Sequence, residues 1–134
     1  MSGRRYVIRP KADHDLDAQA YYFAVQANPE LGHRFLVAAH ETFTLLAKQP
    51  EIGWRLRLKH PDLKSVRAFR VSGFEKILVP YRPRPKGIEI LRVVHGSRNI
   101  QALLRRAVLR TALLRLSLPR YIGQAILDGI TGVP

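Results

Sequence analysis

The first half of the chain has one short extended run followed by two helical patterns. Residues 5–9 (Arg-Tyr-Val-Ile-Arg) alternate in the manner of a strand, which Pro10 should end. Apolar residues then recur at helical spacing over 13–27, and a second apolar stripe runs over 31–46. The intervening Asn28-Pro29-Glu30 is typical of a helix start, because Asn caps a helix and Pro suits its first position. Two helices so close in sequence predict an antiparallel hairpin.

In the second half the pattern changes from helical to extended. Residues 65–71 and 74–82 are rich in β-forming side chains, and Ser72-Gly73 between them predicts a two-residue hairpin. A third strand is predicted over 88–95. Pro80 has no N–H to give to a strand ladder, so it should lie at a bulge or on an unpaired edge. The order β-α-α-β-β-β predicts an α+β fold, in which the N-terminal helical hairpin packs on one face of a small antiparallel sheet.

The chain from Asn99 onward has a different pattern. Leucines and alanines are interrupted by arginines, which predicts a basic C-terminal helix that ends before Pro119. We therefore expect a compact domain over 1–98 and a helical extension over 99–134 that is partly disordered. The extension could pack on the free face of the sheet, dock a partner or a second copy, or lie on a membrane surface.

Composition narrows the class of protein. A chain of 134 residues with 46% hydrophobic and 25% charged residues is typical of one globular domain. The absence of cysteine excludes disulfides, a thiolate nucleophile and Cys-ligated zinc. No signal-peptide stretch and no membrane-spanning apolar run is present. We expect a cytoplasmic protein with no membrane partner.

Charge is distributed unevenly along the chain. The formal net charge is +13, from 23 basic and 10 acidic residues. Residues 1–51 contain six of each sign, so the whole excess lies in residues 52–134. Such a one-sided field attracts nucleic acid, an acidic protein or an anionic surface. The alternative is that the cations only solvate exposed strands.

Several kinds of chemistry have no support in the sequence. The five histidines are scattered without the spacing of a metal site, and no HExxH motif occurs. Neither a P-loop nor a GxGxxG motif is present, and no serine has the context of a nucleophile elbow. We expect neither a metal nor another cofactor.

Cations and one imidazole on the late strands are the candidate site. They could bind a nucleic-acid backbone or an acidic peptide. They could also cleave RNA, with His95 transferring protons and Arg98 stabilising the negative charge of the transition state. Each cation could instead be a solvated surface group, and His95 could have a structural role at the end of its strand. The candidate residues are Arg67, Arg70, Lys76, Arg82, Arg92, His95 and Arg98.

Four motifs, in this order and spacing, resemble ParE toxins of the ParE/RelE superfamily of type II toxin–antitoxin systems. The resemblance covers about residues 5–100. The motifs are Tyr6-x-Ile8-x-Pro10-x-Ala12-x-x-Asp15-Leu16 followed by Tyr21-Tyr22, Asn28-Pro29-x-x-Gly32-x-Arg34-Phe35, Val66-Arg67-x-Phe69-Arg70-Val71-x-Gly73-Phe74, and Ile90-Leu91-Arg92-Val93-Val94-His95-Gly96-Ser97-Arg98. The residues beyond about 105 extend past the usual end of such toxins.

The resemblance implies the same order of elements and a toxin held in a hetero-oligomer with a ParD-like antitoxin, whose C-terminal segment wraps and blocks it. ParE-like members poison DNA gyrase without catalysis, whereas RelE-like members are metal-independent enzymes that cut mRNA on the ribosome. The latter commonly place a Tyr or His near the C-terminal end. Here no Tyr follows Arg98 closely, although His95 is present. We expect a gyrase inhibitor; the alternatives are a RelE-like endoribonuclease and a non-toxic basic binding module.

Overall fold

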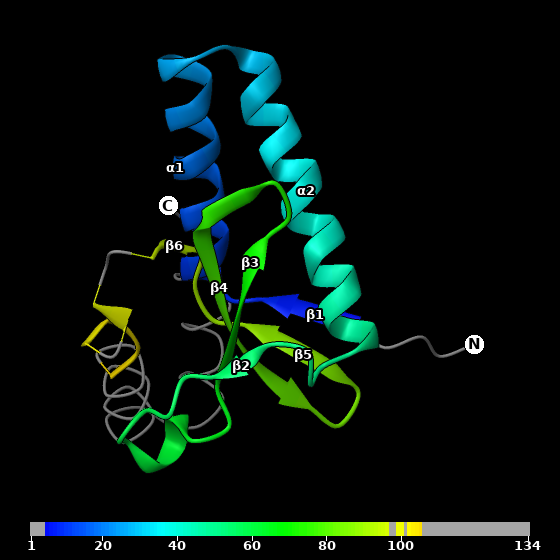
Figure 1. Cartoon of the computed structure of the whole chain (residues 1–134), viewed down its shortest axis with the longest axis vertical. Coiled ribbons are helices and arrows are strands. Elements are labelled where there is room, and N and C mark those ends of the chain that lie inside the picture. Colours follow the sequence, from blue (N-terminus) through cyan, green and yellow to red (C-terminus); the bar gives the residue numbers. More distant parts are fainter. Residues whose placement is uncertain (1–4, 97–98, 101, 106–134) are drawn as a thin grey trace, which may run out of the picture.

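Two long helices and a six-stranded sheet make up most of the described chain, residues 5–96, 99–100 and 102–105, in this computed structural model (Figure 1). The elements in chain order are β1 (Arg5–Ile8), α1 (Pro10–Gln26), α2 (Pro29–Lys48), β2 (Trp54–Arg55), the 3-10 helix η1 (Pro61–Leu63), β3 (Arg67–Val71), β4 (Phe74–Arg84), β5 (Gly87–Ile90) and β6 (Val94–His95). The predicted α+β class, with a helical hairpin followed by sequential strands, is confirmed.

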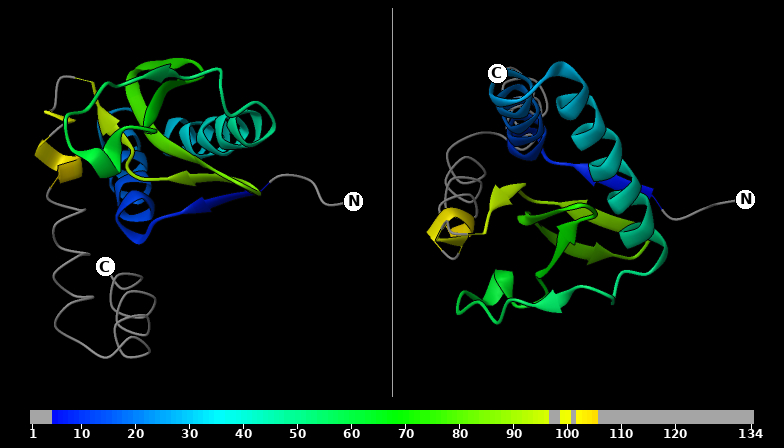
Figure 2. Two further views of the ribbon diagram at one scale, coloured as in Figure 1. Left: turned by 90° about the horizontal axis from the view of Figure 1, so that it is seen from below. Right: turned by 45° about the horizontal axis from the view of Figure 1, so that its top comes forward.

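Local signals place the two helices. Pro10 occupies the first turn of α1, so this helix begins three residues before the predicted 13–27 segment. Asn28 caps α2, because its Oδ1 accepts a hydrogen bond from the Leu31 N–H at 2.8 Å. Both helices lie on the same side of the sheet, as the right-hand view of Figure 2 shows, and their buried apolar residues belong to one core cluster with the strands.

The sheet is mixed rather than antiparallel as predicted. Its strand order is β1-β5-β4-β3-β2, and β1 pairs with β5 in parallel. The predicted strand over 88–95 is also divided, because Leu91–Val93 leave the sheet between β5 and β6. β6 then returns to pair with β4. The two-residue strand β2, which pairs with β3, was not predicted.

The predicted hairpin at Ser72-Gly73 joins β3 to β4, and Gly73 has the positive φ of 81° that such a tight turn requires. Pro80 differs from its prediction, since the bulge lies between Arg70 and Val71. Pro80 sits inside β4, between the stretches that pair with β5 and β6, and its carbonyl accepts a hydrogen bond from the Leu91 N–H at 2.9 Å. The missing N–H therefore interrupts no strand ladder.

Two apolar clusters lie on the two sides of the sheet. The main one joins the helices to β3, β4 and β5, and includes the fully buried Phe35, Phe43 and Tyr81. The smaller one contains Leu58, Leu63, Val66 and Leu104. Leu104 belongs to the helical turn that follows Asn99. The start of the predicted C-terminal helix thus packs against the segment that contains η1, and the helix beyond Arg105 lies outside the described residues.

The pairing of β1 with β5 depends on Gly87. A Cβ at this position would overlap the backbone carbonyl of Arg5, and φ here is 153°. We expect Gly87→Ala to lower the free energy of unfolding by about 2–3 kcal/mol, measured by urea denaturation. Gly73→Ala is the control, since a Cβ added there would meet no atom within 4 Å, and only the positive φ would cost energy, about 1 kcal/mol. Equal costs for the two substitutions would contradict the parallel pairing.

Candidate functional site

The sheet face that turns away from the helices carries arginines around a buried carboxylate. Arg82 of β4 pairs with Glu89 of β5, whereas the adjacent pair, Tyr81 and Ile90, belongs to the main core. Because side chains alternate along a strand, Arg82, Arg84 and Glu89 point to the opposite face. Glu89 is only 6% exposed.

Three guanidinium groups surround the Glu89 carboxylate. Arg9 Nη1 lies 2.8 Å from Oε2, Arg82 Nη2 lies 3.1 Å from Oε1, and Arg84 Nε lies 3.5 Å from Oε1. Burial alone raises the pKa of Glu89, but the hydrogen bond from Arg9 and the charges of Arg82 and Arg9 outweigh burial, so its pKa lies below the ordinary value. One carboxylate thus holds three cations together and leaves an excess positive charge of two.

Arg92 is bound within the fold. It is 8% exposed, and its Nε and Nη2 lie 2.7 Å and 3.0 Å from the two carboxylate oxygens of Asp15 in α1. The Val93 N–H donates to the same carboxylate at 3.0 Å. This bidentate pair ties the stretch between β5 and β6 to the helical hairpin.

Arg67 holds the loop that follows α2. Its Nη1 donates to the carbonyls of Gly53, at 2.6 Å, and Glu51, at 3.1 Å. The Tyr81 hydroxyl donates to the Pro50 carbonyl at 2.6 Å and accepts from the Gly53 N–H at 3.0 Å. Burial raises the pKa of Tyr81, against smaller opposing effects of the Gly53 N–H and Arg67, so the phenol stays protonated and keeps this bond. Arg67 is thus engaged in positioning the loop.

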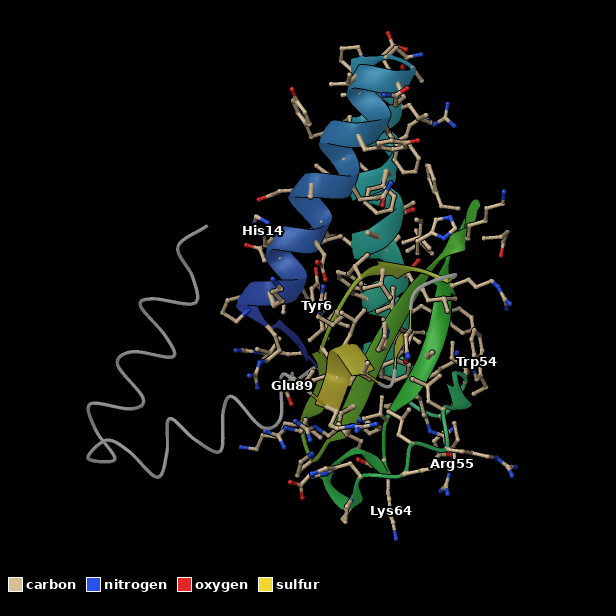
Figure 3. The ribbon with its side chains drawn as sticks, turned by 90° about the vertical axis from the view of Figure 1, so that its left-hand side faces the viewer. Tyr6, His14, Trp54, Arg55, Lys64 and Glu89 are labelled. Atoms are coloured by element: carbon tan, nitrogen blue, oxygen red, sulfur yellow. The ribbon has the colours of Figure 1, made fainter. Side chains whose placement is uncertain are left out.

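Arg70 and Lys76 are exposed. The Arg70 guanidinium lies over the indole ring of Trp54, 4.9 Å from the ring centroid, in cation–π geometry. Arg70 and Trp54 line a hollow of about 510 Å³ between α2 and β3, whose wall also includes Leu45, Glu41 and Glu75. Figure 3 shows Trp54 beside β3, on the other side of the molecule from Glu89. The lining of the hollow thus combines apolar side chains with charged groups of both signs.

His95 lies exposed in β6, opposite Ile77 of β4. Arg98, its predicted partner in an RNA-cleaving site, lies outside the described residues. The predicted site residues are therefore distributed over several places: Arg82 faces Glu89, Arg67 and Arg92 have internal partners, and Arg70 lines the hollow.

Sequence reasoning missed three contributors to these surfaces. Arg9 and Arg84 join Arg82 around Glu89, and Trp54 lies under Arg70. The alternation of Arg82 and Arg84 along one strand, with Glu89 just across the turn, was a signal for part of the cluster. Arg9 gave no such signal, because only the parallel pairing of β1 with β5 brings it there.

Among the residues that the structure describes, no three His, Asp or Glu side chains gather in a way that could hold a metal ion. Within the same residues, no helix has the length and apolar character needed to cross a membrane.

The Glu89 cluster should make stability depend on pH. The native pKa is lowered, so the unfolded state binds more protons in acid; the stabilisation is complete above the unfolded pKa and is lost as the pH falls through the native one. We expect Glu89→Gln to reduce the free energy of unfolding at pH 7 by about 2 kcal/mol, because partly exposed arginines recover some hydration. It should also flatten the loss of stability below about pH 4.5.

The control for this prediction is Glu75→Gln, since Glu75 is exposed and forms no ion pair with another of the described residues. Denaturant titrations of the wild type and both variants at several pH values provide the measurement. An acid dependence that is unchanged in Glu89→Gln would contradict the role given to this carboxylate.

Comparisons with known proteins match the part of the chain that contains these surfaces. The family model described as "ParE toxin of type II toxin-antitoxin system, parDE" matches residues 6–100. Among solved structures, the chain is similar to the "Chromosomal ParDE TA system from P. aeruginosa", with a TM-score of 0.57 and 23% identity over 71% of this chain and 98% of that one. No curated protein matches the sequence. Because the family model spans well over half of the chain, from β1 to beyond β6, the protein belongs to the ParE toxins of type II toxin–antitoxin systems.

Proposed function

We propose that this ParE-family toxin inhibits DNA gyrase without catalysing a reaction, in the cytoplasm, and that a ParD-like antitoxin neutralises it in a hetero-oligomer. The supporting observation is that Arg67 and Arg92 form hydrogen bonds with groups of the fold itself. Cleavage of RNA on this sheet needs cations whose N–H donors are already aimed at the position of the phosphorane rather than at groups of the fold. Arg67 instead holds two loop carbonyls, and Arg92 holds the carboxylate of Asp15. This arrangement favours the gyrase proposal over cleavage of mRNA.

The hollow between α2 and β3 supports the antitoxin part of the proposal. Trp54 and Leu45 are 38% and 39% exposed there, which is high for large apolar side chains of a folded domain. Arg70 can meet an acidic group, and the aromatic ring beneath it can anchor an apolar one. A segment that combines acids with apolar anchors therefore fits this hollow, and we assign it to the antitoxin.

We further propose that the toxin domain ends near residue 98 and that residues 99–134 form a helical extension of it. The family match ends at residue 100. Leu104 is nevertheless buried in one cluster with Leu58 and Val66. The beginning of the extension thus packs against the toxin domain, and a truncated variant should retain this part to keep the cluster filled.

A supercoiling assay tests the gyrase proposal. We expect the purified toxin to inhibit supercoiling by gyrase and to accumulate cleaved DNA–gyrase complexes, since a noncatalytic inhibitor acts by binding its target. Addition of the cognate antitoxin should restore supercoiling. His95→Ala is the control variant and should inhibit like the wild type.

Two results would contradict this proposal. One is full supercoiling without cleaved complexes at toxin concentrations that stop growth. The other is primer extension on translated mRNA that shows cuts in the ribosomal A site which disappear in His95→Ala. That second result would establish the ribonuclease alternative, whereas a chain inactive in both assays would be a non-toxic binding module.

The antitoxin should depend on Trp54. Truncation of a buried aromatic anchor typically costs about 2 kcal/mol, so we expect Trp54→Ala to weaken antitoxin binding by about 30-fold in surface plasmon resonance. The control is Val7→Ala, since Val7 is also exposed, at 62%, but lies in β1 at the other edge of the sheet. Added salt should slow association more than it speeds dissociation. Equal losses of antitoxin affinity in Trp54→Ala and Val7→Ala would contradict the assignment of the antitoxin to the hollow.

A further inference from the structure

We propose that the cations around Glu89 form a binding surface for the phosphate backbone of double-stranded DNA. This surface, called the basic face below, is distinct from the hollow assigned to the antitoxin. The basic face consists of Arg5, Arg9, Arg82, Arg84, Lys86 and Lys64.

Strand pairing and one hydrogen bond bring these cations together from four parts of the chain. Arg84 of β4 is paired with Gly87, and Gly87 is paired on its other side with Arg5 of β1. Arg82 Nη1 donates to the carbonyl of Asp62 in η1 at 3.2 Å, which places η1 beside the cluster. Figure 3 shows Lys64 and Glu89 at the same end of the molecule, away from the turn between the two helices.

Glu89 holds the arginines close together but neutralises only part of their charge, so the cluster can still bind an anion. It accepts hydrogen bonds from Arg9 and Arg82 and lies 3.5 Å from Arg84, so three guanidinium groups stay close together although they repel one another. A guanidinium has five N–H donors. Glu89 takes one donor of Arg9, which is 33% exposed, and faces one of Arg84, which is 57% exposed. The other donors of both side chains are available for phosphate oxygens.

The side chains of this face favour phosphate over a protein partner. Val7 is its one exposed large apolar side chain among the described residues; the others lie on α1, on α2 and in the segment Ile52–Trp54. A protein interface needs buried apolar or aromatic anchors at its centre, and this face offers one valine. A backbone of phosphates needs cations and no apolar anchor.

The same surface favours a duplex over a single strand. Proteins that bind single-stranded nucleic acid stack its bases on exposed aromatic rings. The large aromatic side chains that are exposed in the described chain, Tyr21, Tyr22 and Trp54, do not belong to the basic face. The choice of DNA rather than duplex RNA rests on the proposed function, because gyrase holds duplex DNA.

The test measures binding of the full-length toxin to a short labelled DNA duplex by fluorescence anisotropy, without gyrase, across about 50–200 mM salt. The triple variant Arg5→Ala, Arg84→Ala, Lys86→Ala should weaken binding by tenfold or more and reduce the slope of log K against log salt by about 3. The matched control, Arg34→Ala, Arg70→Ala, Lys76→Ala, removes the same charge from exposed positions elsewhere and should change the affinity by less than about threefold.

Equal losses in the two triple variants would overturn the proposal, since binding would then follow net charge alone. Preference for single-stranded DNA or for duplex RNA over duplex DNA would overturn it too. Antitoxin binding is measured in parallel and should stay unchanged in the basic-face variant. Because no gyrase is present, failure here is separate from failure of the supercoiling assay, and thermal unfolding of each variant confirms that it is folded.

Discussion

The parallel pairing of β1 with β5 is the constraint on which the rest of the structure depends. It brings residues 5–8 beside residues 87–90, which are separated by almost the whole domain. Because α1 follows β1 at Pro10, this pairing also fixes where the helical hairpin meets the sheet. Asp15 then reaches Arg92, and Arg9 reaches Glu89. A single long-range strand pair thus determines the partners of the buried Glu89 and of the partly buried Asp15.

Local signals in the sequence were sufficient for the helices and the hairpin. The cap at Asn28, the apolar stripe of α2 and the Ser72-Gly73 turn each act within a few residues, and all were found where predicted. The parallel strand pair and the division of the third strand depend on contacts between distant residues. Leu91–Val93 leave the sheet, and Arg92 in this stretch binds an aspartate 77 residues away. No local pattern encodes such a contact.

The lack of local signals for long-range contacts also explains why the candidate site was only partly predicted. A sequence shows that Arg67, Arg82 and Arg92 are cations but not which groups they face. Arg92 binds a carboxylate of α1, and Arg67 binds carbonyls of a loop. Both were therefore assigned to a target surface, although each stabilises the fold. The charge asymmetry along the chain was a better guide, since Arg84, Lys86 and Lys64 remain exposed. Arg84 lies beside Glu89, and Figure 3 shows Lys64 at the same end of the molecule as Glu89.

The two proposed surfaces differ in chemistry and lie at different edges of the sheet. Trp54 belongs to β2 at one edge, whereas Glu89 belongs to β5, three strands away, or about 14 Å at the usual spacing. An antitoxin segment seated in the hollow leaves the arginines around Glu89 uncovered. On these proposals, neutralisation works by occupying the apolar surface that a protein target would need, because phosphate contacts alone are strong in dilute salt but weak and unspecific at physiological salt. The basic face then contributes affinity for DNA that a target already holds, and the hollow determines which protein is bound.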